Sequence, residues 1–396
     1  MISAHSCPLG RLGSKDTGGM NIYVREMARE LGRRGHRVDV YTRCHTDMGA
    51  AIVPLGENAR VVHVPAGEQA EADKQDLYAH LPEFTANMQA RIAAEDATYD
   101  LVHSHYWLSG LVGLSLGLSA PHVVMFHTLA ELKRRAEPGE PGPEGRLAGE
   151  RAAVQGADLI LAASTHERWA LSHYYGANPE KIAVVPCGVD TESFRPRDRS
   201  LVRKELGLNG DRLVLFVGRL EPLKGLDVLL GALAQLEERS HVRALIIGGD
   251  ASSESEVARL KELARALGVE DQVVFLGSVE HERLPLFYSA ADVCIMPSSY
   301  ESFGIAALES LSCGTPVIAT RVGGLATLVR DGETGYLVSP RCPEPFAERL
   351  EMLLDNETLR GDLSAAARAH ARAYDWSLIC QQVVARYRDL LEGTPK

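Results

Sequence analysis

The sequence lacks an excess of positive charge and lacks a long unbroken apolar run. Its 42 Lys and Arg face 53 Asp and Glu, and the resulting net charge of −11 argues against general binding to nucleic acid or to anionic membranes. Gly and Ser interrupt the apolar stretch 108–120 too often for a membrane span, and the N-terminus lacks the pattern of a signal peptide. We therefore expect a cytoplasmic protein without an integral membrane segment.

Several chemical signatures are also missing. The seven cysteines include no C-x-x-C pair and lie partly in apolar runs, which indicates a reducing compartment. No Asp-x-Asp occurs, and the histidine pair His103 and His105 has no Cys or carboxylate neighbour, so we expect no bound metal. The absence of a Walker loop and of a dinucleotide fingerprint argues against the simplest kinase and dehydrogenase interpretations.

Short apolar runs alternate with amphipathic segments along both halves of the 396 residues. Apolar residues recur at helical spacing over 20–31 and again over 226–236. Strands that are apolar on both faces indicate parallel sheets covered by helices on each side. The sequence therefore predicts an α/β protein with two Rossmann-like, doubly wound domains. The predicted strands are 37–41, 101–103, 122–126, 159–162, 182–185, 213–218, 242–247 and 292–297.

The domain boundary is expected near Pro186 and Gly188, which interrupt both periodicities. This gives an N-terminal domain over 1–188 and a C-terminal domain over 189–375. Residues 376–396 form a last helix that we expect to pack back on the N-terminal domain. Because ligands of doubly wound sheets bind beyond the carboxyl ends of the strands, we expect the two domains to face each other across a cleft.

Glu301 and Glu309 have seven residues between them and follow the predicted strand 292–297. We expect both on one helix, about 12 Å apart along its axis, a span that suits a sugar and a ribose. The helix N-terminus would favour an anion such as a diphosphate. A lone pair at this spacing is more often a first-turn acid and a solvated residue. The flanking Ser302-Phe303-Gly304 favours the functional interpretation.

Two loops between a strand and a helix also suit phosphates. Gly18 and Gly19 allow a bound group to approach the backbone, although a tight turn would be the preferred explanation if they were the only clue. Arg219 and Lys224 follow the strand 213–218 and would neutralise a leaving diphosphate, although exposed loop cations are usually just solvated. His127 closes the strand 122–126, where its imidazole would reach a bound sugar or simply bond the backbone.

Taken together, these motifs resemble glycosyltransferase family 4, the retaining nucleotide-sugar transferases of GT-B fold, across essentially the whole chain. The resemblance is closest to the branch that holds inositol-phosphate N-acetylglucosaminyltransferases of mycothiol synthesis and sucrose-phosphate synthases, which use phosphorylated acceptors. The matching segments occur in the family's order: 18–21, 103–107, 126–129, 185–190, 218–225 and 301–309.

The resemblance implies a site residue by residue. Arg219 and Lys224 would neutralise the donor diphosphate, Glu309 would bind the ribose, and His127 would contact the donor sugar. Catalytic roles fall to His127, Arg219, Lys224 and Glu301. The remaining implied donor contacts are Gly19, Phe303 and Gly304, and the implied acceptor contacts are Asn21, Lys74, Tyr106, Thr128 and Arg146.

The cation at position 146 has alternatives, because Lys133, Arg134 or Arg135 would also serve. The implied activity is retaining transfer of a hexose or N-acetylhexosamine from a nucleotide sugar, UDP-GlcNAc or UDP-glucose, to a phosphorylated acceptor such as inositol phosphate. Alternatives are transfer to fructose 6-phosphate, a nucleotide-sugar epimerase, and a non-enzymatic nucleotide-sugar sensor. No cofactor is implied beyond the donor, and a homodimer is one of the oligomeric states left open.

Overall fold

The computed structural model describes residues 1–10, 17–44, 51–67, 74–137, 145–208, 212–238, 241–250 and 253–393, without the side chains of 74–76. Its chain divides into two compact units. Among the described residues, the first unit holds 1–10, 19–186 and 376–393, and the second holds 17–18 and 187–375.

The second unit is built on a parallel sheet of six strands in the order β10-β9-β8-β11-β12-β13. The chain starts at the centre with β8, adds β9 and β10 toward one edge, and then crosses to β11 on the other side of β8. This reversal creates a topological switch point between β8 and β11. The strands are β8 Arg212–Val217, β9 Val242–Ile247, β10 Val273–Gly277, β11 Val293–Met296, β12 Val317–Thr320 and β13 Gly335–Val338.

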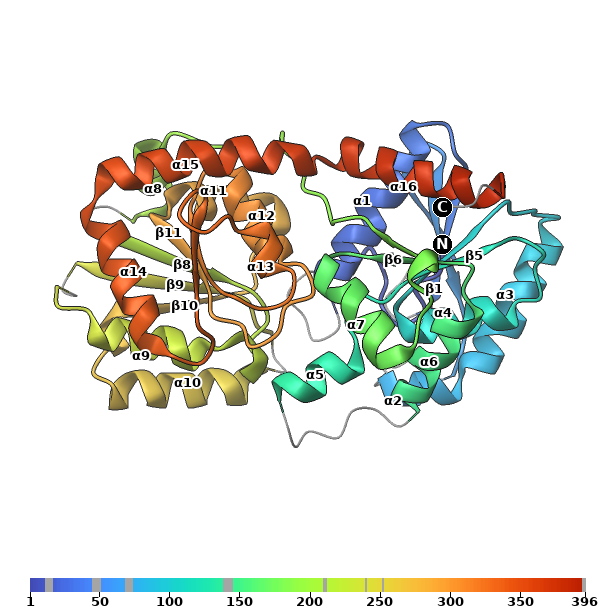
Figure 1. Ribbon diagram of the computed structural model, residues 1–396, viewed down its shortest axis with the longest axis horizontal. Helices are drawn as coiled ribbons and strands as arrows, with labels where there is room; N and C mark the ends of the chain where they lie inside the picture. The colour runs from blue at the N-terminus through green and yellow to red at the C-terminus, as the bar shows by residue number, and fades with distance from the viewer. Residues whose placement is uncertain are drawn as a thin grey trace. The chain divides into compact units, whose positions relative to one another are not determined.

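Helices cover both faces of this sheet (Figure 1). They are α8 Arg199–Leu206, α9 Leu226–Gln235, α10 Glu254–Ala266, α11 Leu284–Ala290, α12 Ile305–Ser312, α13 Leu325–Leu328, α14 Pro343–Asp355 and α15 Glu357–Ala371. The fully buried Phe216, Leu229, Ile246 and Phe346 belong to one core between strands and helices. Burial on both sides explains why these strands are apolar at successive positions.

The first unit has the same plan. Ile2 bridges to Tyr41 and to Ser104, so the N-terminal segment joins the strands β1-β3-β2 to the strands β4-β5-β6-β7. A second switch point therefore lies at Ile2, with β1 on one side and β4 on the other. The strands are β1 Val38–Arg43, β2 Ile52–Gly56, β3 Ala59–Val64, β4 Val102–His105, β5 His122–Met125, β6 Leu159–Ala162 and β7 Ile182–Val184.

Strand β2 corrects the prediction of parallel sheets, because it pairs antiparallel with β3. It is a short edge strand that contains Pro54 and ends at Gly56, and most of its residues are exposed or half-buried. Such a strand needs no crossover helix and carries no continuous apolar run. The sequence signal on which the parallel prediction rests is therefore missing here.

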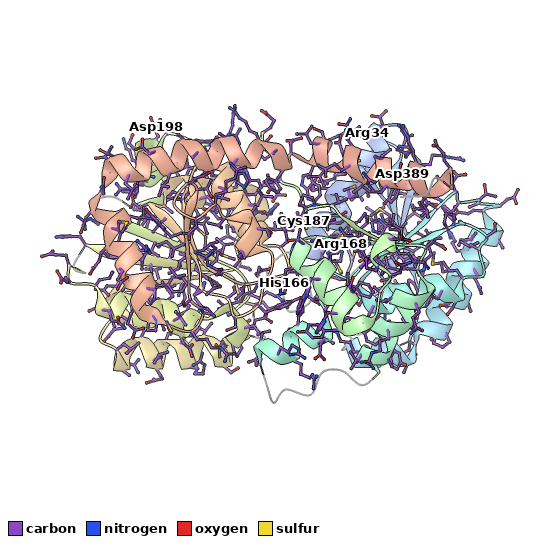
Figure 2. The ribbon with its side chains drawn as sticks, in the orientation of Figure 1. Arg34, His166, Arg168, Cys187, Asp198 and Asp389 are labelled. Atoms are coloured by element: carbon purple, nitrogen blue, oxygen red, sulfur yellow. The ribbon has the colours of Figure 1, made fainter. Side chains whose placement is uncertain are left out.

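The helices of the first unit are α1 Gly19–Arg33, α2 Lys74–Ala79, α3 Leu81–Ala94, α4 Tyr106–Ser115, α5 Ala130–Ala136, α6 Arg146–Gly156, α7 Thr165–Tyr175 and α16 Trp376–Leu391. The C-terminal α16 packs beside α1 (Figure 1). The Trp376 ring lies 5.5 Å from that of Tyr23. Arg34, labelled beside α16 in Figure 2, donates a 2.7 Å hydrogen bond to the Ser377 carbonyl.

Candidate active site

The loops after β8 and β11 meet at the switch point of the second unit. After β8 the chain forms a 3-10 turn, Pro222–Lys224, and Gly225 then adopts the left-handed conformation before α9. A Cβ on Gly225 would lie 2.2 Å from the Pro297 carbonyl oxygen, and Ser299 N donates to Leu223 O at 2.8 Å. The two loops are thus packed backbone against backbone at the carboxyl end of the sheet, where doubly wound domains bind ligands.

This packing brings two of the predicted donor residues into contact. Lys224 Nζ lies 2.6 Å from Glu301 Oε2, and both side chains are less than one-fifth exposed. Arg219, on the same loop as Lys224, pairs with Glu221 at 3.0 Å and is about one-third exposed. The loop therefore presents one ammonium and one guanidinium beside a carboxylate, a set of groups that can hold a phosphate and a sugar hydroxyl.

The prediction that Glu301 and Glu309 share one helix is wrong. Helix α12 begins at Ile305, and Gly304 before it has φ of +101°, a left-handed conformation that a helix does not continue through. Glu301 therefore lies in the loop, Glu309 lies in the helix, and the axial spacing of about 12 Å does not apply. Phe303, in the same loop, is buried.

A third loop, after β12, supports the segment 301–304 and was not identified from sequence. A Cβ on Gly323 would lie 1.9 Å from the Glu301 carbonyl oxygen, and one on Gly324 would lie 2.4 Å from Phe303 Cα. Gly324 N donates to Glu301 O at 3.0 Å. Only glycine permits so close an approach. Two adjacent glycines, which begin three residues after the apolar strand β12, were a sequence signal from which this contact could have been predicted.

Glu309 is buried and both of its oxygens are bonded. His281 Nε2 lies 2.6 Å from Oε1, and the Tyr288 hydroxyl donates to Oε2 at 2.9 Å. Burial, together with the nearby Glu309 carboxylate, raises the pKa of Tyr288 well above its ordinary value, so the phenol stays a donor. Carboxylate oxygens have further lone pairs for a ligand hydroxyl. No local sequence pattern linked His281 and Tyr288 to Glu309.

The structure brings together three of the predicted acceptor residues in the first unit. Arg146, at the start of α6, donates from Nη2 to the Thr128 hydroxyl at 3.1 Å. Its guanidinium carbon lies 5.2 Å from the centroid of the Tyr106 ring. Tyr106 has φ of +74°, a backbone conformation that is strained for a bulky residue and is often found at functional sites.

Glu150 holds Arg146 in place. It lies one helical turn further along α6, is fully buried, and accepts a 2.8 Å hydrogen bond from Arg146 Nε. The Tyr175 hydroxyl donates to the other carboxylate oxygen at 2.5 Å. Arg146 and Glu150 are four positions apart, a spacing from which an ion pair on one face of a helix could have been predicted. By contrast, the alternative cations Arg134 and Arg135 are more than half exposed and pair with Glu131.

The remaining predicted contacts, Lys74, Asn21 and Gly19, are not brought into either of these clusters by a described contact. Lys74 begins α2, but its side chain lies outside the described residues. Asn21 is buried and donates from Nδ2 to Ser6 Oγ and to Cys7 O, each at 2.7 Å. Gly19 is the exposed first residue of α1. Asn21 thus ties the start of α1 to the loop that follows Ile2 at the switch point.

His127 follows β5 with φ of +60°. Its Nε2 lies 3.0 Å from His105 Nδ1, and burial lowers its pKa to about 3. Burial likewise lowers the pKa of His105 well below its ordinary value. Both rings are therefore neutral at physiological pH.

Two further observations concern chemistry outside these clusters. In the described part of the chain, no group of three or more His, Cys, Asp or Glu residues is arranged to hold a metal. A hydrolase-like G-x-S-x-G match occurs at 113–117, but Ser115 ends helix α4 and donates to Leu111 O at 2.9 Å. A nucleophile elbow requires a strand-to-helix turn instead.

None of the described helices has the length and apolarity to cross a membrane.

Comparison with known proteins identifies the class. Residues 17–193 match the family described as Glycosyltransferase Family 4, and residues 198–370 match Glycosyl transferases group 1. With two Rossmann-like domains, these matches define a glycosyltransferase of GT-B fold. The D-inositol 3-phosphate glycosyltransferase of Acidothermus cellulolyticus is 44% identical over 99% of this chain and 90% of its own length. The chain belongs to glycosyltransferase family 4.

Further relatives agree with this assignment. The D-inositol 3-phosphate glycosyltransferase of Corynebacterium glutamicum is 39% identical over 99% of this chain and 96% of its own. Sucrose-phosphate synthase from Thermosynechococcus elongatus superposes with a TM-score of 0.92 at 32% identity, covering 99% and 98% of the two chains. Anabaena HepE shares the fold, with a TM-score of 0.76 at 22% identity over 96% and 98%. The predicted family, fold and enzyme class are confirmed.

Proposed function

We propose that the protein is a retaining transferase that moves a hexose or N-acetylhexosamine from a UDP-sugar, UDP-GlcNAc or UDP-glucose, to a phosphorylated polyol such as inositol phosphate. The observation that carries the proposal is the buried Arg146, which contacts Thr128 and Tyr106 and is fixed by Glu150. A buried guanidinium beside a hydroxyl suits a phosphate monoester. The relatives named D-inositol 3-phosphate glycosyltransferase support this acceptor class.

In this proposal the second unit binds the donor. Arg219 and Lys224 neutralise the diphosphate, while Glu301 and the amides of Phe303 and Gly304 hold the sugar. Glu309 accepts hydrogen bonds from the ribose. The position of Lys224 and Glu301 at the carboxyl end of β8 and β11 supports these assignments. His127 contacts the donor sugar, and Gly19, Asn21 and Lys74 complete the substrate contacts.

The reaction needs no positioned carboxylate pair. The bond between the anomeric carbon and the diphosphate oxygen breaks while an acceptor hydroxyl bonds to that carbon from the same face. The leaving diphosphate takes the hydroxyl proton. Arg219 and Lys224 stabilise the charge that develops on the diphosphate, so the protein supplies positioning and electrostatic stabilisation. We propose that these cations act in place of a divalent ion, which makes turnover insensitive to EDTA.

The test is to incubate the protein with UDP-GlcNAc or UDP-glucose, with and without inositol phosphate, and to measure UDP release and product mass. We expect UDP release that depends on the phosphorylated acceptor, and no release with unphosphorylated inositol. Epimer formation without an acceptor would instead indicate an epimerase. Donor binding without any turnover would indicate a sensor.

Fructose 6-phosphate is the second acceptor to test, because the sucrose-phosphate synthase structure covers nearly the whole chain at 32% identity. Both acceptors carry a phosphate monoester, so the Arg146 cluster serves either one. Competition between them at fixed donor concentration identifies the preferred acceptor. Cytoplasmic location and a homodimer stay predictions.

A further inference from the structure

A chain of polar rings extends from the half-buried, proposed catalytic His127 through two buried histidines of the first unit. His127 Nε2 lies 3.0 Å from His105 Nδ1, and the His105 ring centroid lies 4.1 Å from that of His103. His103 Nδ1 lies 2.6 Å from the hydroxyl of Tyr387 on α16. His103 and His105 are each at most 1% exposed. His103 and His105 belong to β4 and the half-buried Tyr387 to α16, and the proposed reaction does not use them.

The hydrogen-bond partners allow the proton positions to be assigned. His105 Nε2 is buried and has no hydrogen-bond partner among the described residues. A buried N–H without an acceptor is costlier than a buried lone pair without a donor. In a neutral imidazole the single proton of His105 is therefore assigned to Nδ1, from where it is donated to His127 Nε2. His127 then keeps its own proton on Nδ1.

We propose that His105 is a positioning residue that fixes the tautomer and ring orientation of His127. His127 Nδ1 then serves as a hydrogen-bond donor to an oxygen of the bound sugar. This inference deepens the proposed function and depends on its assignment of His127 to the donor sugar. The left-handed backbone of His127 fits the same role, because a strained φ of +60° is retained only where surrounding contacts hold it. The Tyr23 ring, whose centroid lies 5.4 Å from that of His127, packs against another side of the His127 imidazole.

The first test reads the tautomer directly and needs no substrate. Protein with 15N-labelled histidine is studied by long-range 1H–15N NMR, and the His127 signals are assigned with a His127→Gln variant. We expect the Nδ1–H tautomer of His127 in the wild type and a mixture of tautomers in His105→Leu. An Nε2–H tautomer in the wild type would overturn the proposal whatever the substrates are.

The second test is kinetic and uses the UDP-release assay. His105→Leu removes the hydrogen bond, and we expect kcat to fall about tenfold with little change in KM for the acceptor, the size expected for one lost hydrogen bond. His105→Asn places an amide near the former Nδ1 and should recover part of this loss. In a His127→Gln background, His105→Leu should cost far less than in the wild type.

His122 offers a matched control. It is buried in the same sheet, on β5, and its Nε2 lies 2.8 Å from Ser104 Oγ, so His122→Leu also removes one buried hydrogen bond. We expect its kcat to match the wild type in the folded fraction. If His105→Leu and His122→Leu have equal kcat, positioning by His105 is refuted. If His127→Gln itself is fully active, the role of His127 in the proposed function fails instead.

Discussion

Lys224 and Glu301 form an ion pair that a donor diphosphate would have to share. Because both side chains lie at the switch point and are mostly buried, the ammonium is held close to where the leaving group would carry charge. The sequence indicated both residues through their places after strands. It did not indicate that they touch, since they are 77 positions apart in the sequence.

We expect Lys224→Met to lower kcat/KM for the donor about a hundredfold or more, because one preorganised cation that stabilises developing charge is lost. The acceptor KM should change little. Steady-state UDP release at varied donor concentration measures the effect. Lys204→Met is the control, since Lys204 lies exposed on α8 of the same unit. Equal losses in the two variants would contradict the role of Lys224.

Arg146→Lys tests the acceptor site while keeping a positive charge beside Glu150. A lysine cannot reproduce the forked contact to Thr128 and Glu150, so we expect the KM for the phosphorylated acceptor to rise about tenfold with an unchanged donor KM. Initial-rate kinetics with varied acceptor measure this. Arg134→Lys, an exposed α5 cation, should leave the acceptor KM unchanged. A raised acceptor KM in Arg134→Lys, together with an unchanged acceptor KM in Arg146→Lys, would instead place the acceptor phosphate at α5.

At the scale of elements, the loops at the carboxyl ends of β8, β11 and β12 interlock through glycines. The apolar runs predicted the strands well, and β9 at 242–247 matches the prediction to the residue. They did not predict the start of α12, because a single left-handed Gly304 decides it. The support of Glu301 by Gly323 depends on a contact between segments distant in sequence, which local patterns do not contain.

We expect Gly323→Ala to destabilise the second unit and to weaken donor binding. Its φ is +46°, and the new Cβ would lie 1.9 Å from the Glu301 carbonyl oxygen, so the loop that carries Glu301 must move. Gly332→Ala is the matched control: its φ is +77°, but no atom lies within 4 Å of the new Cβ. Backbone strain alone costs about 1 kcal/mol.

Thermal unfolding and donor titration separate the two effects of these glycine variants. Both variants should lose stability through backbone strain, whereas only Gly323→Ala should also lose donor affinity, by about tenfold if one hydrogen bond to the sugar is lost. If both variants bind the donor as the wild type does, the loop after β12 does not position Glu301.

At the scale of the whole molecule, burial makes the first unit sensitive to acid. Burial lowers the pKa of His127 to about 3 and that of His122 to about 4, and it lowers the pKa values of His103 and His105 well below 6.5. The unfolded chain takes up these protons first as the pH falls below about 6.5. Each group therefore lowers the free energy of unfolding by about 1.4 kcal/mol per pH unit until its folded pKa is reached.

Glu167 acts in the opposite direction. Its burial raises the carboxyl pKa to about 7, so the folded state binds this proton first and gains stability as the pH falls from about 7 to about 4.5. The stability gained through Glu167 alone does not offset the stability lost through the four histidines. We expect the unfolding temperature of the first unit to fall steeply below about pH 6 and less steeply in His122→Leu. Thermal melts followed by circular dichroism measure both slopes, and parallel slopes would contradict the assignment.

The place of α16 has a consequence for how the chain is made. This helix is the last described element to leave the ribosome, yet its Trp376 and Tyr387 cover Tyr23 and His103, which are synthesised near the beginning. The first unit is therefore incomplete until residues 376–391 have been synthesised, and the side of α1 that faces α16 stays open until the second unit has been made. A nascent chain stalled before residue 376 should be bound by chaperones at this surface.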